Sequence, residues 1–289
     1  MHRALFFLAL LVACQPAARD DDDSTTADDD DDSVVDDDDT GDDDDTSSTE
    51  QPDVDAADIV GDAYSHLVIE LDAVEGHGPT AAALTAFEDE VERLIGLGAI
   101  AKDSFEIVLD DTLPANPDPD HVYTFEEQQD LSEGARDLPA EADTAYIHML
   151  YLDGGSELDG SNSSVLGYAY GGSWIVMFRD NIDGACDGST VLDLLSPGAA
   201  AEACSMTEAG VLTHEAGHLF GLVNNGAPMQ TDHQDDANGA HCDNEDCLMY
   251  WLAETSSAAD TVANRYLGGG SGFPPFDDDC VDDLRALAE

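Results

Sequence analysis

The chain has 289 residues, of which 66 are acidic and 8 are basic, giving a net charge of −58 at pH 7. From residue 61 to the end, 45 acidic residues stand against 6 basic ones. Nucleic acids and anionic lipid surfaces both attract basic proteins, so this composition excludes them as partners. The stretch 61–289 is long enough to form one domain with a substantial core.

The first residues have the features of an export signal. Residues 1–3 are a short positive segment, and residues 4–13 form an apolar run that is too short to span a membrane. The run ends in Leu11-Val12-Ala13-Cys14, which resembles the bacterial lipobox, in which the cysteine becomes lipid-modified after cleavage. We therefore predict a signal peptide over 1–13 and a lipid anchor on Cys14 in the bacterial cell envelope, with the domain outside the cytoplasm, periplasmic or at the cell surface. An ordinary secretory signal with an incidental cysteine is the alternative.

Residues 14–60 are dominated by runs of aspartate separated by Ser, Thr, Gly and Ala. Such a segment buries no apolar area, and its like charges repel one another, so we expect a disordered acidic linker. After a lipid anchor, its role would be to hold the folded domain away from the membrane. Loose Ca²⁺ binding by the aspartates is the alternative.

Hydrophobic patterning predicts the elements of the remaining chain in order. Strands are expected at 66–71, 105–109, 145–152 and 173–178, with loops at 114–119 and 153–164. A helix opens at Pro79 and ends at Gly96, and Thr124 with Glu127 forms a capping box for a second, short helix. A long helix follows the last strand. This order favours an α/β (α+β) fold with a mixed sheet.

Five cysteines remain beyond Cys14. Outside the cytoplasm they should oxidise, and the economical pairings are Cys186–Cys204 and Cys242–Cys247. Cys280 is left without a partner.

A zinc-binding pattern lies in the long helix, which we expect to open at Ser205 with Glu208 completing a capping box. The pattern is His214-Glu215-x-x-His218. Histidines four residues apart lie on one helical face, so both rings can bind one Zn²⁺ ion. Glu215 lies beside them, where it can take a proton from metal-bound water. The other interpretation is a surface helix that carries two histidines.

Gly221 extends the pattern to His214-Glu215-x-x-His218-x-x-Gly221, which resembles the metzincin signature. A glycine at this place lets the helix stop and the chain turn back toward the metal. In most metzincins a third histidine follows three residues later, but here that position is Asn224, a poor zinc ligand.

The later run His241-Cys242-x-x-x-x-Cys247-x-Met249 is similar to the continuation of this signature in archaemetzincins. The resemblance implies that 223–240 is an inserted loop, that His241 is the third zinc ligand, and that Met249 forms the Met-turn beneath the metal. His233 is the runner-up for the third ligand, and Asp232 is a further alternative.

The same resemblance implies a metzincin-like catalytic domain with a twisted mixed sheet and an active-site helix. Archaemetzincins use four cysteines for a second, structural zinc, but this chain has only Cys280 downstream, so we expect one zinc and a Cys242–Cys247 disulfide that clamps the loop carrying His241. An edge strand near the active site pairs with substrate in metzincins, and the strand 173–178 is assigned that role, with a plain core strand as the alternative.

These features predict a membrane-anchored zinc metalloendopeptidase with a protein or peptide substrate, in which Glu215 is the general base. The alternative is a catalytically inactive surface lipoprotein that acts as a binding or adhesion module. A Ca²⁺-binding module on the acidic loops 153–159 and 180–187 is a third idea, although these loops lack EF-hand spacing.

Overall fold

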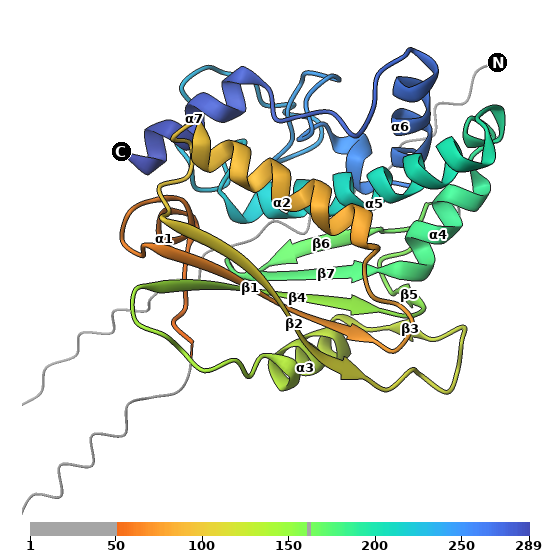
Figure 1. The fold of residues 1–289 in the computed structure, drawn as a ribbon, viewed down its shortest axis with the longest axis horizontal. Helices are drawn as coiled ribbons and strands as arrows, with labels where there is room; N and C mark the ends of the chain where they lie inside the picture. Colours follow the sequence, from red (N-terminus) through yellow and green to blue (C-terminus); the bar gives the residue numbers. More distant parts are fainter. Residues whose placement is uncertain (1–50, 161–162) are drawn as a thin grey trace, which may run out of the picture. The chain divides into compact units, whose positions relative to one another are not determined.

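The computed structural model describes residues 51–160 and 163–289. The predicted signal peptide, the lipidated Cys14 and most of the acidic linker lie outside the described residues. Inside them, the protein has the mixed α/β architecture that the sequence predicts, with a twisted mixed sheet and helices packed on it (Figure 1).

Five strands form the main sheet in the order β2-β1-β4-β7-β6. Their bounds are β1 His66–Val74, β2 Ser104–Leu113, β4 Thr144–Leu152, β6 Gly167–Tyr170 and β7 Trp174–Phe178. The first four in sheet order are parallel, and β6 pairs antiparallel with β7 at the edge. Two short strands, β3 (Val122–Tyr123) and β5 (Gly155–Ser156), pair separately.

The central strands are apolar because the sheet is covered on both faces. All nine residues of β4 are buried, as expected for a strand in the middle of a mainly parallel sheet. The assignment of strand 173–178 to the sheet edge is wrong. β7 lies between β4 and β6, and both of its sides are hydrogen-bonded, so the edge strand of this side is β6.

Two long helices, α2 (Ala81–Gly96) and α5 (Pro197–Leu219), cross one face of the sheet, and α3 (Phe125–Ala135) covers the other (Figure 1). Thr124 and Glu127 form the predicted capping box of α3. The remaining helices are α1 (Ala56–Val60), α4 (Arg179–Gly188), α6 (Ala258–Leu267) and α7 (Asp278–Ala288), with 3₁₀ turns η1 (Leu192–Leu194) and η2 (Trp251–Glu254).

The folded part begins before the predicted boundary at residue 61. Helix α1 is capped by Asp55, and its residues Ile59 and Val60 are completely buried in the main core. These two side chains supply the apolar area that the preceding aspartate runs lack, so residues 56–60 belong to the domain and not to the linker.

The long helix α5 begins nine residues earlier than predicted. Ser196 is its N-cap and Pro197 its first residue, a placement that suits a proline without a free N–H. Ser205 lies in the helix interior. The carboxylate of Glu208 does not reach back to Ser205, because it accepts hydrogen bonds from Thr80 and pairs with Arg179.

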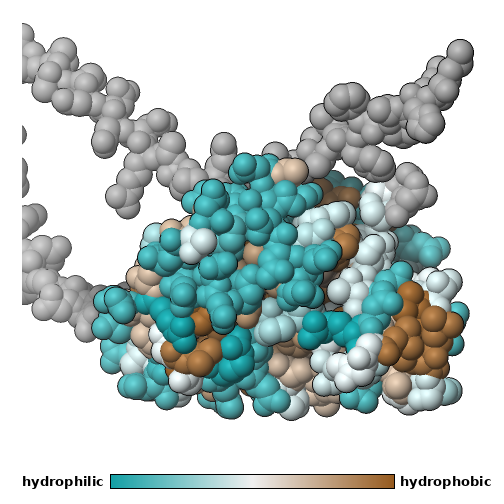
Figure 2. All heavy atoms as spheres, turned by 90° about the horizontal axis from the view of Figure 1, so that it is seen from above, coloured by the Kyte–Doolittle hydropathy of each residue, from teal (hydrophilic) through white to brown (hydrophobic). Residues whose placement is uncertain are grey.

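A disulfide joins Cys186 of α4 to Cys204 of α5, as the sequence predicts. Within the described residues, no helix has both the length and the apolar composition needed to cross a membrane. The face shown in Figure 2 is mainly hydrophilic, with small separate apolar areas, as the acidic composition leads one to expect.

Candidate metal centre

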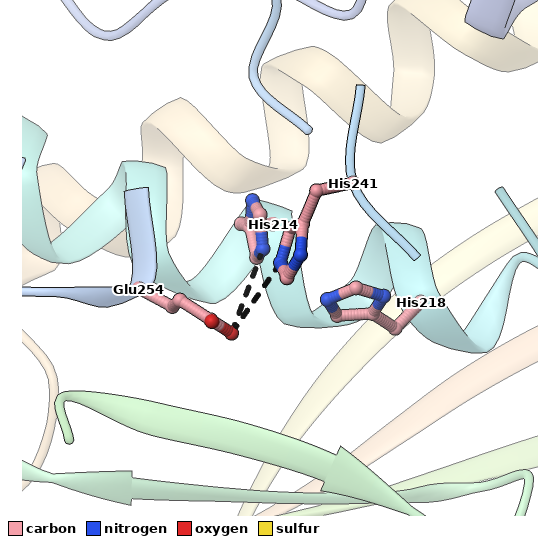
Figure 3. A group of neighbouring side chains, drawn as sticks. All are labelled: His214, His218, His241 and Glu254. Carbon is pink, nitrogen blue, oxygen red and sulfur yellow. Dashed lines mark ion pairs between the residues drawn. The ribbon is translucent and has the colours of Figure 1, made fainter. Parts of the chain in front are cut away.

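Three histidines from two distant parts of the chain meet beside α5. His214 and His218 lie on successive turns of the helix, with ring centroids 4.8 Å apart. The ring of His241, which follows the inserted loop, lies 5.2 Å from each of them. Their side chains converge on one point (Figure 3). The sequence predicted this set of three, and the fold brings it together.

Hydrogen bonds fix which nitrogen each of two rings presents to this point. Nδ1 of His214 donates to the carbonyl of Leu248 over 2.7 Å, and Nδ1 of His241 donates to that of Asn238 over 2.6 Å. In the neutral form of each ring, Nε2 therefore keeps a lone pair. Both Nε2 atoms are buried without a hydrogen-bond partner. Unpartnered lone pairs that converge in this way fit a zinc ion, for which neutral imidazole nitrogen is a preferred ligand.

Burial also keeps the helix histidines neutral. It lowers the pKa of His214 to about 3, with help from the two neighbouring rings, and it lowers the pKa of His218 to about 3, with help from His241. Burial lowers the pKa of His241 too, but interaction with Glu254 outweighs this and leaves the pKa raised. Neutral rings are the form that binds a metal.

The turn around Met249 packs against α5 beside Gly217, between the two helix histidines in the sequence. Met249 is fully buried, and its carbonyl accepts a hydrogen bond from the backbone N–H of Cys242, which fixes the segment that carries His241. A Cβ on Gly217 would lie only 2.5 Å from the sulfur of Met249, so the helix needs glycine where this turn approaches it.

Gly221 ends the metal-binding helix in the way the sequence predicts. Its φ of +83° lies in the left-handed region, and a Cβ there would lie 2.6 Å from the backbone nitrogen of Ala227. The chain turns away at this point, and the next residues, Val223 and Asn224, also have positive φ angles. Asn224 is exposed and contacts Gln234, outside the histidine cluster.

Glu215 is buried between α5 and the edge strand β6. Its Oε1 has no hydrogen-bond partner. Burial raises the pKa of Glu215 well above its ordinary value, the carboxylate of Glu254 adds to this, and a hydrogen bond from the backbone of Ala169 in β6 opposes it. A cation bound at the histidines would also lower the pKa of Glu215, because it favours the charged carboxylate. Glu215 is thus placed as a proton acceptor next to the candidate metal position.

Glu254, which the sequence reasoning missed, completes the cluster. Its Oε2 lies 3.6 Å from Nε2 of His241 and 3.9 Å from Nε2 of His214 (Figure 3). The four residues form a group whose potential ligand atoms all lie within 4.8 Å of one another. No sequence motif could have found Glu254, because it lies five residues beyond Met249 in a 3₁₀ turn with no recognisable spacing.

The runner-up ligands lie elsewhere. Asp232 is exposed, and His233 is buried away from the three histidines. Nε2 of His233 contacts Asp283 over 2.9 Å, and its Nδ1 lies 3.4 Å from the sulfur of Cys242. Burial opposes the protonation of His233, but the contacts with Cys242 and Asp283 raise its pKa to about 8.

The predicted Cys242–Cys247 disulfide is wrong, because both cysteines are free and buried. Their neighbours explain the difference. Cys280, in the first turn of α7, lies with its sulfur 3.6 Å from that of Cys247, and His233 approaches Cys242 from the inserted loop. Three thiols and one imidazole from three parts of the chain therefore gather in one buried cluster, which also includes the carboxylate of Asp277.

The Ca²⁺ idea finds no support in the two acidic segments. Residues 180–187 are not a loop, because they lie in helix α4. The carboxylate of Asp153 accepts hydrogen bonds from the backbone of Asn116 and from the hydroxyl of Tyr123. Asp159 accepts from two backbone amides and from the side chain of Asn181. These oxygens are used in holding the loops together.

No family model matches the chain, and no curated protein matches it. Among solved structures, the chain is similar to archaemetzincin from Methanopyrus kandleri, with 21% sequence identity and a TM-score of 0.45 over 77% of this chain and 96% of that one. It is also similar to metalloproteinase-II from Bacteroides fragilis, with 15% identity and a TM-score of 0.42 over 79% of this chain and 54% of that one. The function proposed below rests on the residues of this chain.

Proposed function

We propose that the protein is a zinc metalloendopeptidase that hydrolyses peptide bonds in protein or peptide substrates. The observation that carries this proposal is the convergence of His214, His218 and His241 beside the buried carboxylate of Glu215. Metal-assisted hydrolysis requires this arrangement: three nitrogen ligands hold the metal, and a nearby carboxylate that does not bind the metal acts as the base.

Zinc bound to the three histidines would supply a Lewis acid that polarises the substrate carbonyl and makes water more acidic. Glu215 accepts the proton of the attacking water and passes it to the amine that leaves. Burial of Glu215 suits it to both steps, because a carboxylate with a raised pKa holds a proton long enough to deliver it.

The edge strand β6 is suited to hold the substrate. It pairs with β7 on one side only, so the backbone groups of its other side are free to bond an extended peptide. The backbone of Ala169, a residue of this strand, lies close enough to the carboxylate of Glu215 to influence its pKa. A peptide added to β6 would therefore run past the general base, and β6 takes the role that the sequence assigned to 173–178.

Replacement of Glu215 by Gln tests this function. The variant should keep its zinc, because Glu215 is not among the residues grouped as ligands, and it should lose peptidase activity by several orders of magnitude. Zinc content and cleavage of a casein substrate measure the two properties. Glu245→Gln, an exposed position, serves as a control that should keep both. Full activity in Glu215→Gln would overturn the mechanism.

We also propose a second zinc site, in addition to the one zinc per chain that the sequence predicts. Its candidate ligands are His233, Cys242, Asp277 and Cys280, whose ligand atoms lie within 4.8 Å of one another, with Cys247 beside Cys280. The sulfurs of Cys247 and Cys280 lie 3.6 Å apart. This distance is far longer than a disulfide bond of roughly 2.05 Å, and it is close to the separation of about 3.8 Å between two thiolates on one tetrahedral zinc. We expect near two zinc ions per chain in the wild type and near one in His233→Ala, with the histidine site unchanged. One zinc in both proteins would contradict this.

Membrane anchoring through Cys14 and the spacer role of the acidic linker remain part of the proposal. The alternative of an inactive surface binding protein drew its support from the missing histidine at Asn224. The approach of His241 to both helix histidines favours the enzyme.

A further inference from the structure

Glu254 faces the candidate metal position from η2, a segment separate from the helix that carries His214 and His218. It is the last residue of η2, and its Oε2 lies 3.6 Å and 3.9 Å from the Nε2 atoms of His241 and His214. Figure 3 shows the carboxylate directed toward the two rings, from a segment that neither histidine belongs to.

In the neutral form of the two rings, all three atoms are hydrogen-bond acceptors. Nδ1 of each ring donates to a backbone carbonyl, so each neutral ring presents the lone pair of its Nε2 toward the carboxylate. Lone pairs that face one another in a buried place repel unless a cation lies between them. The atoms are also spaced for a shared metal, since two ligands of a tetrahedral zinc stand about 3.4 Å apart when each bond is about 2.1 Å.

We propose that Glu254 is the fourth protein ligand of the metal in the resting protein, so that substrate gains access only when η2 moves aside. A catalytic zinc site keeps one position open for water or substrate, whereas a site with four protein ligands is closed. This inference rests on the metal site of the proposed function. It adds to that function a resting state that is closed by a residue of the same chain.

The segment that carries Glu254 is less buried than the histidines that it faces. None of the residues of η2 is buried, and its N-terminus has no side-chain cap. The side chain of Glu254 is 35% exposed, whereas those of His214 and His241 are 0% and 9% exposed. Because η2 is a short 3₁₀ turn whose residues are only partly buried, we expect it to open at a lower cost in free energy than the buried helix that carries His214.

The test uses the full chain and compares Glu254→Gln and Glu254→Asp with the wild type. Gln is a poor zinc ligand, and Asp is too short to reach the histidines, so both variants should lose the fourth ligand. We expect the dissociation constant of Zn²⁺ at the histidine site, measured by competition with a chromophoric chelator, to rise roughly ten-fold or more. Glu245→Gln, which removes an exposed carboxylate nearby, should leave it unchanged.

A second readout reports the open position directly. In the Co²⁺-loaded chain, acetohydroxamate should change the visible d–d spectrum of Glu254→Gln at concentrations at least roughly ten-fold below those needed for the wild type, because no carboxylate competes. Equal Zn²⁺ affinity and equal response to acetohydroxamate in the variant and the wild type would overturn the proposal.

Peptidase assays separate this inference from the function on which it rests. If the Glu254 variants show weaker Zn²⁺ binding and an open position but no protein cleaves peptides, Glu254 is a ligand and the peptidase function is wrong. If the wild type cleaves peptides and the Glu254 variants bind Zn²⁺ as the wild type does, the peptidase function stands and the ligand role of Glu254 fails.

Discussion

Gly217 lies between the two helix histidines, at the point where the turn around Met249 touches α5. A Cβ at this position would lie 2.5 Å from the sulfur of Met249 and 2.9 Å from the ring of Phe276. The carbonyl of Met249 also accepts the hydrogen bond from Cys242 that fixes the segment carrying His241. The absence of a Cβ at Gly217 thus lets the Met249 turn, and with it His241, come close to His214 and His218.

We predict that Gly217→Ala destabilises the protein by about 1–3 kcal/mol, because a packed core must shift to admit the methyl group. It should also weaken zinc binding at the histidines. Gly184→Ala is the matched control, since Gly184 is exposed inside α4 with open space around it, and alanine there should stabilise the helix by up to about 1 kcal/mol. Urea unfolding of both variants measures the change, and equal stabilities would contradict the prediction.

The sequence could locate His214, Glu215 and His218, because helical periodicity alone puts residues four apart on one face. The choice of His241 over His233 rested on the resemblance to the archaemetzincin continuation and not on helical periodicity, since both residues come from a segment whose course depends on tertiary contacts. Their surroundings in the fold separate them. His241 lies against the helix histidines, whereas His233 lies between Cys242 and Asp283. The role of Glu254 also depends on the fold, since nothing in its sequence neighbourhood marks it.

Among the elements, α5 is held in place by one buried ion pair. Glu208 is 1% exposed and accepts hydrogen bonds from the backbone and hydroxyl of Thr80, the N-cap of α2. It also lies 2.9 Å from the guanidinium of Arg179, the first residue of α4. One carboxylate therefore fixes the ends of two helices against the middle of the metal-binding helix.

Removal of this carboxylate should cost about 3 kcal/mol of stability, because it leaves a largely buried arginine with only Asp183 as a partner. We predict this loss for Glu208→Ala, measured as the free energy of unfolding in urea. Glu202→Ala changes an exposed acid of the same helix and should stay within about 0.5 kcal/mol of the wild type. A similar small effect of both substitutions would show that the ion pair does not hold α5.

The sequence predicted the buried strands and α2 well, because the strands are apolar runs and α2 has apolar residues at helical spacing. It missed β6 and the helices α1, α4, α6 and α7, and it started α5 too late. Ser205 and Glu208 have the spacing of a capping box, but a tertiary partner for Glu208 and a better cap at Ser196 override the local signal.

The molecule as a whole carries charge of almost one sign. From residue 61 onward, 45 acidic residues stand against 6 basic ones. Three carboxylates, those of Glu70, Asp110 and Asp137, even lie within 4.8 Å of one another. Folding brings such charges together, so their mutual repulsion lowers the stability of the compact state, and salt should relieve it.

We therefore predict that the melting temperature rises by several degrees between 10 mM and 1 M NaCl, as the screening length falls from about 30 Å to about 3 Å. For a domain of this size, about 2–4 °C corresponds to 1 kcal/mol, so the repulsion relieved amounts to a few kcal/mol. Calorimetry on the full chain measures the shift. Choline chloride at equal ionic strength is the control, because it screens charge without offering a small cation. An equal rise in both salts assigns the effect to screening, a rise in NaCl alone assigns it to bound Na⁺, and a flat or falling melting temperature would mean that the acidic surface does not oppose folding.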